Sequence, residues 1–166
     1  MKNNVNDQRH VISALVENRA GVLAHIAGLF SSRGYNIESL AVGETEDPTL
    51  SRMTIVVRGE ERILEQIRKQ LEKIIDVVKV QDFSGLDYVE RDLMLIKVGA
   101  PAEKRGEILE VVNVFRGKVV DIGAKHLTIE ISGPEAKLDA FITLMNPYGV
   151  KELARSGRIA ILRGVK

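Results

Sequence analysis

Hydrophobic and polar residues follow one another along the first half of the chain in a pattern that predicts strands and helices in a regular order. Residues 11–16 are almost continuously apolar, as in a buried strand, and Gly34 is a natural end for the helix that follows. Two more strands are expected at 37–42 and around 53–57, joined through a turn-forming segment. The apolar stripe of the helix consists of Leu23, Ile26, Ala27 and Phe30.

A second amphipathic helix and a fourth strand complete this half of the chain. Glu60 to Ile75 has apolar residues on one face and charges on the other, and residues 77–83 follow as a strand. The predicted order is therefore strand, helix, strand, strand, helix, strand. The apolar face of the second helix consists of Leu64, Ile67, Leu71 and Ile74.

The same order begins again after the segment SGLDYVE, which is typical of a linker. A strand is expected at 93–98, followed by a helix that has Pro101 in its first turn and ends before Gly117. The order of a strand followed by a helix, as at the beginning of the first half, is therefore predicted again here. The apolar stripe of this helix consists of Ile108, Val111, Val112 and Phe115.

The rest of the second half repeats the remaining elements. Residues 118–122 and 127–131 predict another hairpin, and Ser132 with Glu135 indicates a capping box at the start of the last helix. Residues 159–162 are expected to form the last strand of the second sheet. The last helix has its apolar residues at Leu138, Phe141, Ile142 and Met145.

The complete pattern predicts an α+β protein with two ferredoxin-like βαββαβ units in tandem. The expected boundaries are 9–84 for the first unit, 85–90 for a linker and 91–164 for the second unit. This fold occurs in enzymes, RNA-binding proteins and sensors of small molecules, so the function has to be inferred from particular residues.

Composition excludes some kinds of partner. The chain has 24 Lys and Arg against 23 Asp and Glu, so its net charge of +1 favours neither nucleic acid nor an anionic membrane as a partner. The absence of cysteine excludes disulfides and thiolate sites and is typical of a reducing compartment. No apolar run is long enough for a membrane span, and the polar start lacks a secretory signal. We expect a cytoplasmic protein that binds neither nucleic acid nor membrane.

The sequence gives little indication of an active site. His10, His25 and His126 lie in separate predicted elements, without metal-ligand spacing and without a recognisable nucleophile motif. Small acyl-phosphate hydrolases of this fold use an Arg and an Asn, and Arg19 with Asn36 could be assigned to those roles. The glycine-rich phosphate loop of those enzymes is missing here, so we predict no catalytic residue and no metal site.

RNA binding is a second alternative on this fold. Arg33-Gly34-Tyr35 resembles the beginning of an RNA-binding motif, but Asn36, Ile37 and Glu38 stand where aromatic residues should follow. Aromatic residues make up only 4% of the chain, which leaves no stacking surface for bases. The sequence therefore disfavours RNA binding.

The turn from Asn18 to Gly21 has two interpretations. It lies between the first strand and the first helix, where unpaired backbone N–H groups at the positive end of the helix dipole can bind a carboxylate. Gly21 would allow close approach to the backbone, and Asn18 would add an amide. Alternatively, Asn18 only caps the helix and Gly21 only forms the turn, which from chemistry alone is the better supported interpretation.

Longer motifs decide between these interpretations. The stretch ENRAGVLAHIAGLFSSRGYNIESLAVGETEDPTLSRMTIVV resembles the regulatory (small) subunit family of acetohydroxyacid synthase, also called acetolactate synthase. The later segments QLEKIIDVVKV, VERDLMLIKV, FRGKVVDI, KLDAF and ELARSGRIAILRG extend the resemblance from His10 to Gly164. The combination of RGYNIESL with DPTLSRMT is highly specific, whereas ENRAGVL alone indicates only an amino-acid-binding ACT domain.

The resemblance implies that residues 9–84 form an ACT domain that pairs with a second copy, so that two four-stranded sheets join side by side. It further implies that valine above all, and sometimes leucine or isoleucine, binds at that interface. Leu23, Ile37 and Leu40 could form the apolar walls of that site or could be core residues. The implied effector-binding residues are Asn18, Ala20, Gly21, Val22 and Leu23 from one subunit, with Asn36 and Ile37 from the other.

The resemblance also implies a partner that carries the chemistry. The family's large subunit uses thiamine diphosphate, magnesium and usually FAD, whereas this chain has a motif for none of them and is expected to bind no cofactor. It should activate the large subunit and mediate feedback inhibition. The turn GETEDPTLSR is either a contact with the large subunit or a solvated loop. The alternative function is a stand-alone amino-acid sensor that controls a different enzyme, a transporter or a transcription factor.

Overall fold

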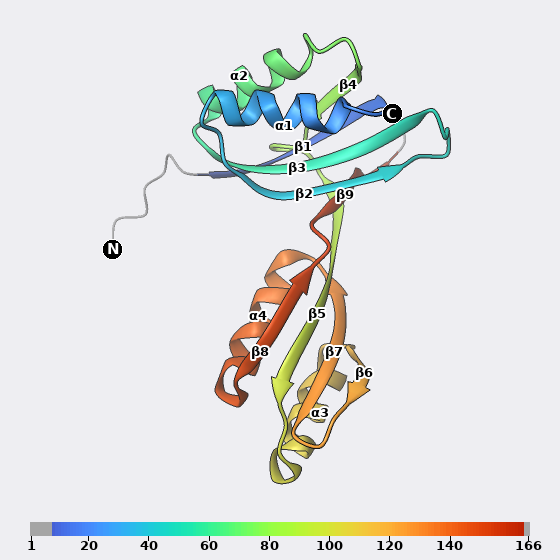
Figure 1. Cartoon of the computed structure of the whole chain (residues 1–166). Helices are drawn as coiled ribbons and strands as arrows, with labels where there is room; N and C mark the ends of the chain where they lie inside the picture. Colours follow the sequence, from blue (N-terminus) through green and yellow to red (C-terminus); the bar gives the residue numbers. More distant parts are fainter. Residues whose placement is uncertain (1–7, 165–166) are drawn as a thin grey trace. The chain divides into compact units, whose positions relative to one another are not determined.

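The structure, a computed structural model, describes residues 8–164 and contains two compact units. One unit consists of the chain up to Val89 together with the segment from Arg158 onward, and the other consists of Glu90–Gly157. Each unit has an antiparallel sheet with helices on one face, as Figure 1 shows. The predicted tandem of ferredoxin-like βαββαβ units is confirmed.

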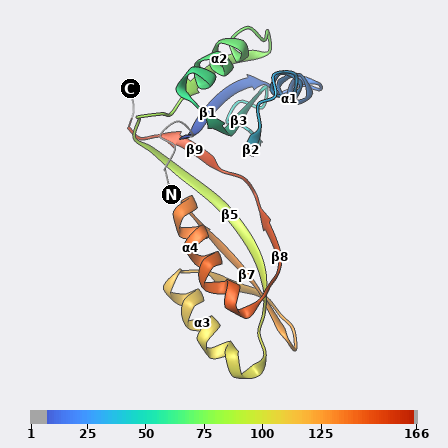
Figure 2. The same ribbon diagram turned by 90° about the vertical axis from the view of Figure 1, so that its left-hand side faces the viewer.

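The first unit has the strand order β2-β3-β1-β4, so that β2 and β4 lie at the two edges of the sheet. Figures 1 and 2 both show α1 and α2 on the same face of this sheet. Its elements are β1 (Gln8–Glu17), α1 (Val22–Ser32), β2 (Ile37–Glu44), β3 (Leu50–Gly59), α2 (Glu61–Leu71) and β4 (Val77–Asp82).

The core of the first unit lies between the sheet and the two helices. Helix α2 packs through the predicted face, whereas α1 packs through a stripe that begins at Val22 rather than at Leu23. Leu23 and Ala27 are exposed, while Ile26 and Phe30 are buried as predicted. The prediction was wrong for Leu23 and Ala27 because both Val22 and Leu23 are apolar, and only the backbone at the helix start decides which of them faces the core.

The second unit has the strand order β6-β7-β5-β8, with α3 and α4 packed against its core. Phe115 and Phe141 meet edge to face there, with ring centroids 5.3 Å apart. The elements are β5 (Tyr88–Gly99), η1 (Ala102–Lys104), α3 (Arg105–Val114), β6 (Lys118–Ile122), β7 (His126–Gly133), α4 (Glu135–Met145), η2 (Asn146–Tyr148) and β8 (Val150–Arg155).

The last strand of the second sheet differs from the prediction. The edge strand beside β5 is β8. The predicted strand, β9 (Ile159–Leu162), begins after three further residues and also pairs with β5, but it is not part of the β6-β7-β5-β8 order. Ala160 is buried beside Val11 and Val56 of the first unit, and Leu162 packs against the same cluster. Residues 150–155 were missed because five of the six are exposed, which removes the apolar signal of a strand.

Two local predictions are also wrong. Ser132 does not cap α4, because it is still paired in β7 and Pro134 is the residue that precedes the helix without a side-chain cap. The linker is shorter than SGLDYVE suggests, since Tyr88 to Glu90 already belong to β5. In both places a strand continues further than its apolar pattern indicates.

Candidate functional site

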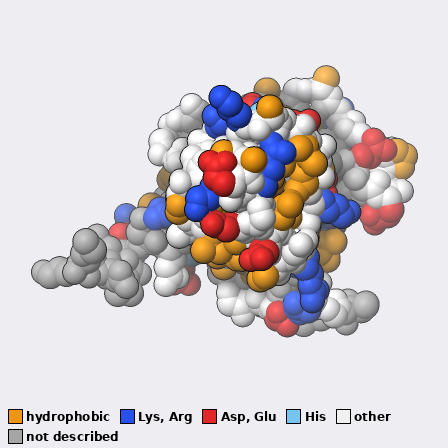
Figure 3. Space-filling model, turned by 90° about the horizontal axis from the view of Figure 1, so that it is seen from below, with side chains coloured by type: hydrophobic (Ala, Val, Ile, Leu, Met, Phe, Trp, Pro, Cys, Tyr) orange, Lys and Arg blue, Asp and Glu red, His pale blue; other side chains and the backbone are white. Residues whose placement is uncertain are grey.

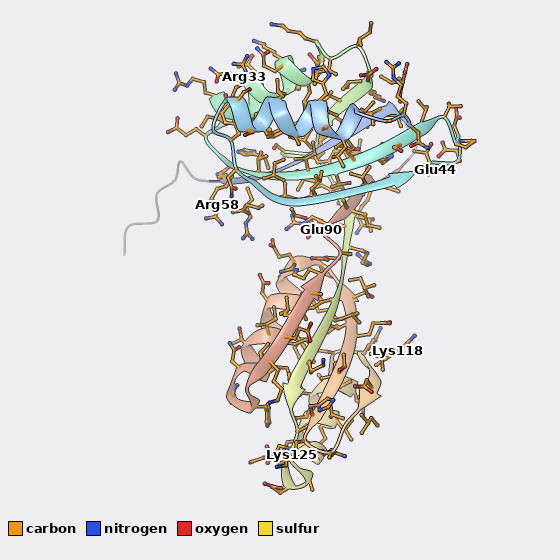
Figure 4. All side chains as sticks on the ribbon, viewed as in Figure 1. Arg33, Glu44, Arg58, Glu90, Lys118 and Lys125 are labelled. Carbon is orange, nitrogen blue, oxygen red and sulfur yellow. The ribbon has the colours of Figure 1, made fainter. Side chains whose placement is uncertain are left out.

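One end of the first sheet brings together the turn after β1 and the loop between β2 and β3. Asn18 joins them, because its backbone N–H donates to the Thr49 carbonyl at 2.7 Å and its side-chain Nδ2 donates to the Pro48 carbonyl at 2.9 Å. Glu44, at the end of β2, lies at this end of the sheet in Figure 4. The predicted site residue Asn18 is therefore held by a loop 30 residues away in sequence.

Helix α1 begins with an open N-terminus directly after this turn. Gly21 is the residue before the helix, with a left-handed φ of 90°, and no side chain in residues 8–164 caps the helix. The first turn has no acidic residue, whereas α2, α3 and α4 have Glu61, Glu107 and Glu135 there. Backbone N–H groups of a first helical turn have no partner inside the helix, so this end of α1 is suited to bind an anion.

Arg19 fixes the turn from the other side. Its guanidinium contacts the buried carboxylate of Asp76 and lies 3.0 Å from Glu17, and the backbone N–H of Glu17 donates to the Asp76 carbonyl at 2.9 Å. The hydrogen bond and the charge of Asp76 raise the pKa of Arg19, followed by the charge of Glu17. Arg19 is thus a structural cation between two carboxylates, which argues against its use as a phosphate-binding catalytic residue.

Asn36 and Ile37 lie at the opposite end of the same sheet. Ile37 of β2 lies opposite Val57 of β3, which lies opposite His10 of β1. His10 is seven residues before Glu17, the last residue of β1, which lies next to Asn18. At about 3.3 Å per residue, roughly 23 Å of strand separate the two ends. Figure 4 shows Arg33 and Arg58 at this far end, away from Glu44. One chain therefore does not bring Asn36 to Asn18, and the hydrolase-like pair of Arg19 and Asn36 is not formed within it.

The side chains at the two ends differ in exposure. Among the predicted site residues, Val22 is only 4% exposed and belongs to the core, whereas Leu23 is 46% exposed. Ile37 and Leu40 are half-buried and pack against the core of the first unit. Asn36 is exposed and makes no side-chain hydrogen bond with any other described residue. Of the three possible apolar walls, Leu23 is thus the one that faces outward.

Strand β2 forms the edge of the sheet that connects these two ends. It pairs only with β3 in the described part of the chain, so its other side presents backbone donors and acceptors to a neighbour. The helix that begins the site, α1, is exposed along its outer surface at Leu23, Ala24 and Ala27. An edge strand beside an exposed apolar helix surface is typical of a place where a second sheet can join.

The other sequence features give no competing site. Arg33-Gly34-Tyr35 ends α1 instead of lying in a central strand, with Gly34 at a φ of 69° and the N–H of Tyr35 bonded to the Phe30 carbonyl. The described residues contain no cluster of three or more His, Asp or Glu side chains placed to hold a metal ion. Lys and Arg side chains are interspersed with Asp and Glu on the face shown in Figure 3.

The sequence did not indicate two residues that shape the site. Asp76 holds Arg19, and Asp47 organises the loop whose carbonyls hold Asn18. The Asp-Pro dipeptide at 47–48 is a turn signal that could have identified Asp47, whereas nothing in the local pattern around Asp76 marks it.

None of the helices in the described residues is long and apolar enough to cross a membrane.

Comparison with known families finds a separate match for each half of the chain. Residues 12–79 match the family described as AHAS small subunit-like ACT domain. Residues 91–164 match the family described as small subunit of acetolactate synthase. The first match contains the turn at Asn18 to Gly21, the strand β2 and the loop around Asp47.

Individual relatives agree over nearly the full chain. The probable acetolactate synthase small subunit of Archaeoglobus fulgidus is 54% identical over 158 residues, which is 95% of this chain and 99% of that protein. The acetolactate synthase small subunit of Mycolicibacterium smegmatis is 52% identical over 155 residues, 93% of this chain and 91% of the relative. The crystal structure of the Thermotoga maritima acetolactate synthase small subunit has a TM-score of 0.87 at 43% identity, covering 96% of this chain and 99% of that one. The chain therefore belongs to the family of acetolactate synthase small subunits.

Proposed function

We propose that this chain activates the catalytic large subunit of acetolactate synthase and mediates feedback inhibition by branched-chain amino acids, mainly valine. The observation that supports this most is the start of α1 without a side-chain cap, on a sheet whose edge strand is β2, in a chain whose relatives are named small subunits. A carboxylate-bearing effector would complete the helix N-terminus, which no side chain of the described residues caps.

The proposed site requires two chains. If the β2 strands of two copies pair antiparallel about a two-fold axis, the Ile37 end of one strand comes to lie beside the Glu44 end of the other. The exposed Asn36 of the partner chain would then face the end of the sheet that holds Asn18 and Gly21. This pairing brings together residues that are about 23 Å apart in one chain, at the strand rise given above.

Each part of the effector has a matching group in this arrangement. The α-carboxylate would bind the N–H groups after Gly21, and the amides of Asn18 and of the partner's Asn36 would bind the carboxylate or the ammonium group. The exposed Leu23 provides an apolar wall for a branched side chain, while Ala20 and Val22 contribute backbone and Ile37 contributes from the partner chain. The carboxylate, the ammonium group and the branched side chain of valine would thus each have a partner in the proposed site.

The contact with the large subunit is proposed for the turn GETEDPTLSR, because residues 46–49 at its centre are exposed and its Pro48 carbonyl accepts a hydrogen bond from Asn18. Thiamine diphosphate, magnesium and flavin are assigned to the large subunit, and this chain is assigned no catalytic residue. The cysteine-free composition agrees with a cytoplasmic site of action. The alternative, a stand-alone amino-acid sensor, differs in that it needs no large subunit.

Addition of this chain to its large subunit should raise acetolactate formation at least several-fold, and valine should reverse much of that increase. The purified chain alone, supplied with pyruvate, thiamine diphosphate and magnesium, should form no acetolactate because its sequence has no motif for the cofactor. The measurement is a colorimetric acetolactate assay over a panel of amino acids.

Lysine and glutamate serve as controls in that panel, because their side chains carry a charge that the apolar wall at Leu23 cannot pair. Turnover by the chain alone would contradict a regulatory role. A large subunit that neither binds this chain in a pull-down nor responds to it would support the stand-alone sensor instead.

A further inference from the structure

The loop between β2 and β3 is built around the carboxylate of Asp47. Its Oδ1 accepts a bond from the backbone N–H of Thr49 at 2.9 Å and another from the Thr49 hydroxyl at 2.6 Å. The backbone of Asp47 adds three more bonds. Its carbonyl accepts from the Leu50 N–H at 2.9 Å and from the Thr45 hydroxyl at 3.0 Å, and its N–H donates to the Thr45 hydroxyl oxygen at 3.2 Å. The side chain of Asp47 thus holds the Thr49 end of the loop, and the backbone of Asp47 holds Thr45 and Leu50.

Two carbonyls of this loop accept hydrogen bonds from Asn18. Pro48 accepts from the Asn18 side chain and Thr49 accepts from its backbone. Asn18 Nδ2 carries two hydrogens, so the bond to Pro48 leaves one N–H and the carbonyl oxygen Oδ1 for a further partner. The loop therefore sets the position and the rotation of the Asn18 amide, without contacting the start of α1 itself.

We propose that Asp47 is a positioning residue of the effector site, which acts by holding the 45–49 loop in the shape that orients Asn18 toward a bound amino acid. This inference rests on the proposed function, because it assigns a role in binding the same effector. Asp47 touches no group of the effector. Its contribution is that the Asn18 amide is oriented before the ligand arrives, so less conformational freedom is lost on binding.

The two hydrogen bonds from Thr49, the side-chain one first, lower the pKa of Asp47. Its carboxylate therefore remains ionised as an acceptor over the neutral pH range. An asparagine at the same position keeps an Oδ1 acceptor of the same geometry without the charge, whereas alanine removes the acceptor. Comparison of the asparagine and alanine variants therefore shows whether the hydrogen-bond acceptor at Asp47 or its negative charge is required.

Coupling of this kind is reciprocal. If an ordered loop strengthens effector binding by some factor, bound effector must favour the ordered loop by the same factor. Valine should therefore slow amide hydrogen exchange at Thr45, Asp47, Thr49 and Leu50, whose N–H groups bond within the loop. The size of this protection should match the loss of valine affinity when the loop is loosened.

The test uses the full chain as a dimer, with valine as the probe. Asp47→Ala should weaken valine binding by about three- to ten-fold in calorimetry, the size expected when a hydrogen-bonded support is removed. Asp47→Asn should bind within about two-fold of the wild type, since the acceptor is retained. Glu46→Gln is the matched control, because Glu46 is exposed in the same loop and its side chain makes no hydrogen bond or ion pair with another described residue.

Hydrogen exchange on the same samples completes the test. Saturating valine should protect the loop amides in the wild type and in Glu46→Gln, but not in Asp47→Ala. Equal valine affinity of Asp47→Ala and the wild type, or an Asp47→Asn variant as weak as Asp47→Ala, would overturn the positioning role. If the wild-type chain binds no branched-chain amino acid at all, the proposed function itself is wrong, which is a different and recognisable result.

Discussion

Gly21→Asp should remove the response of the holoenzyme to valine while leaving its activation by this chain intact. The new carboxylate would lie within about 4 Å of the effector carboxylate, which costs on the order of 4 kcal/mol at an effective dielectric constant near 20. Even if solvent halves this repulsion, the affinity for valine falls more than tenfold. The measurement is holoenzyme activity as a function of valine concentration, with the dimer verified by analytical ultracentrifugation.

The backbone at Gly21 requires a matched control for this experiment. A Cβ at Gly21 meets no atom within 4 Å, but the φ of 90° is unfavourable for most side chains. Gly21→Asn has nearly the shape of aspartate, tolerates left-handed backbone better than most residues and adds no charge. Gly21→Asn should therefore retain much more of the valine response than Gly21→Asp. Joint loss of activation and inhibition in a soluble Gly21→Asp dimer would mean that both functions use one surface.

Asn36→Ala should weaken valine binding by about 1–3 kcal/mol, because it leaves a polar group of the effector buried without a partner. The fold should be unaffected, since Asn36 is exposed and bonds to no other described side chain. Calorimetry of the dimer measures the affinity, and urea unfolding verifies that stability is unchanged. Unchanged valine affinity would show that Asn36 is only the residue between α1 and β2.

Much of the fold could be predicted because the apolar pattern agrees with the final packing. The face of α2 with Leu64, Ile67 and Leu71 is buried as predicted, and so are the alternating residues of β3 and β7. Gly34 ends α1 with the left-handed backbone that glycine favours. Such positions depend only on neighbours along the chain, so the sequence contains enough information to place them.

The wrong predictions come from information that lies elsewhere in the chain. The helix α3 ends before Gly117 as predicted, but the pattern did not indicate that Arg116 has a φ of 55° there. A Cβ at Gly117 would lie 3.3 Å from the Glu130 carbonyl of β7, which is a tight contact with a strand distant in sequence. Similarly, the burial of Ala160 depends on Val11 and Val56, more than a hundred residues away in sequence. Contacts of this kind leave no periodic signal.

The candidate site was only partly predictable for the same reason. The local sequence places Asn18 and Gly21 in the turn before α1, but it favoured Asn18 as the cap of that helix, whereas the Asn18 side chain bonds to Pro48 and Gly21 precedes the helix. The contacts that support the site join segments distant in sequence. Asn18 bonds to Pro48 and Thr49, and Arg19 contacts Asp76. The separation of Asn36 from Asn18 appears only in the strand register, and it is the reason that the proposed effector site takes its residues from two chains.

The most direct test of the two-chain site uses mixed dimers. Asn18→Ala and Asn36→Ala each damage both sites of a homodimer, because every site takes one residue from each chain. A heterodimer of the two variants, isolated with two different affinity tags, has one site with both substitutions and one site with neither. Calorimetry should therefore find one valine site of wild-type affinity per heterodimer and none in either homodimer. Two equally weakened sites in the heterodimer would contradict the account.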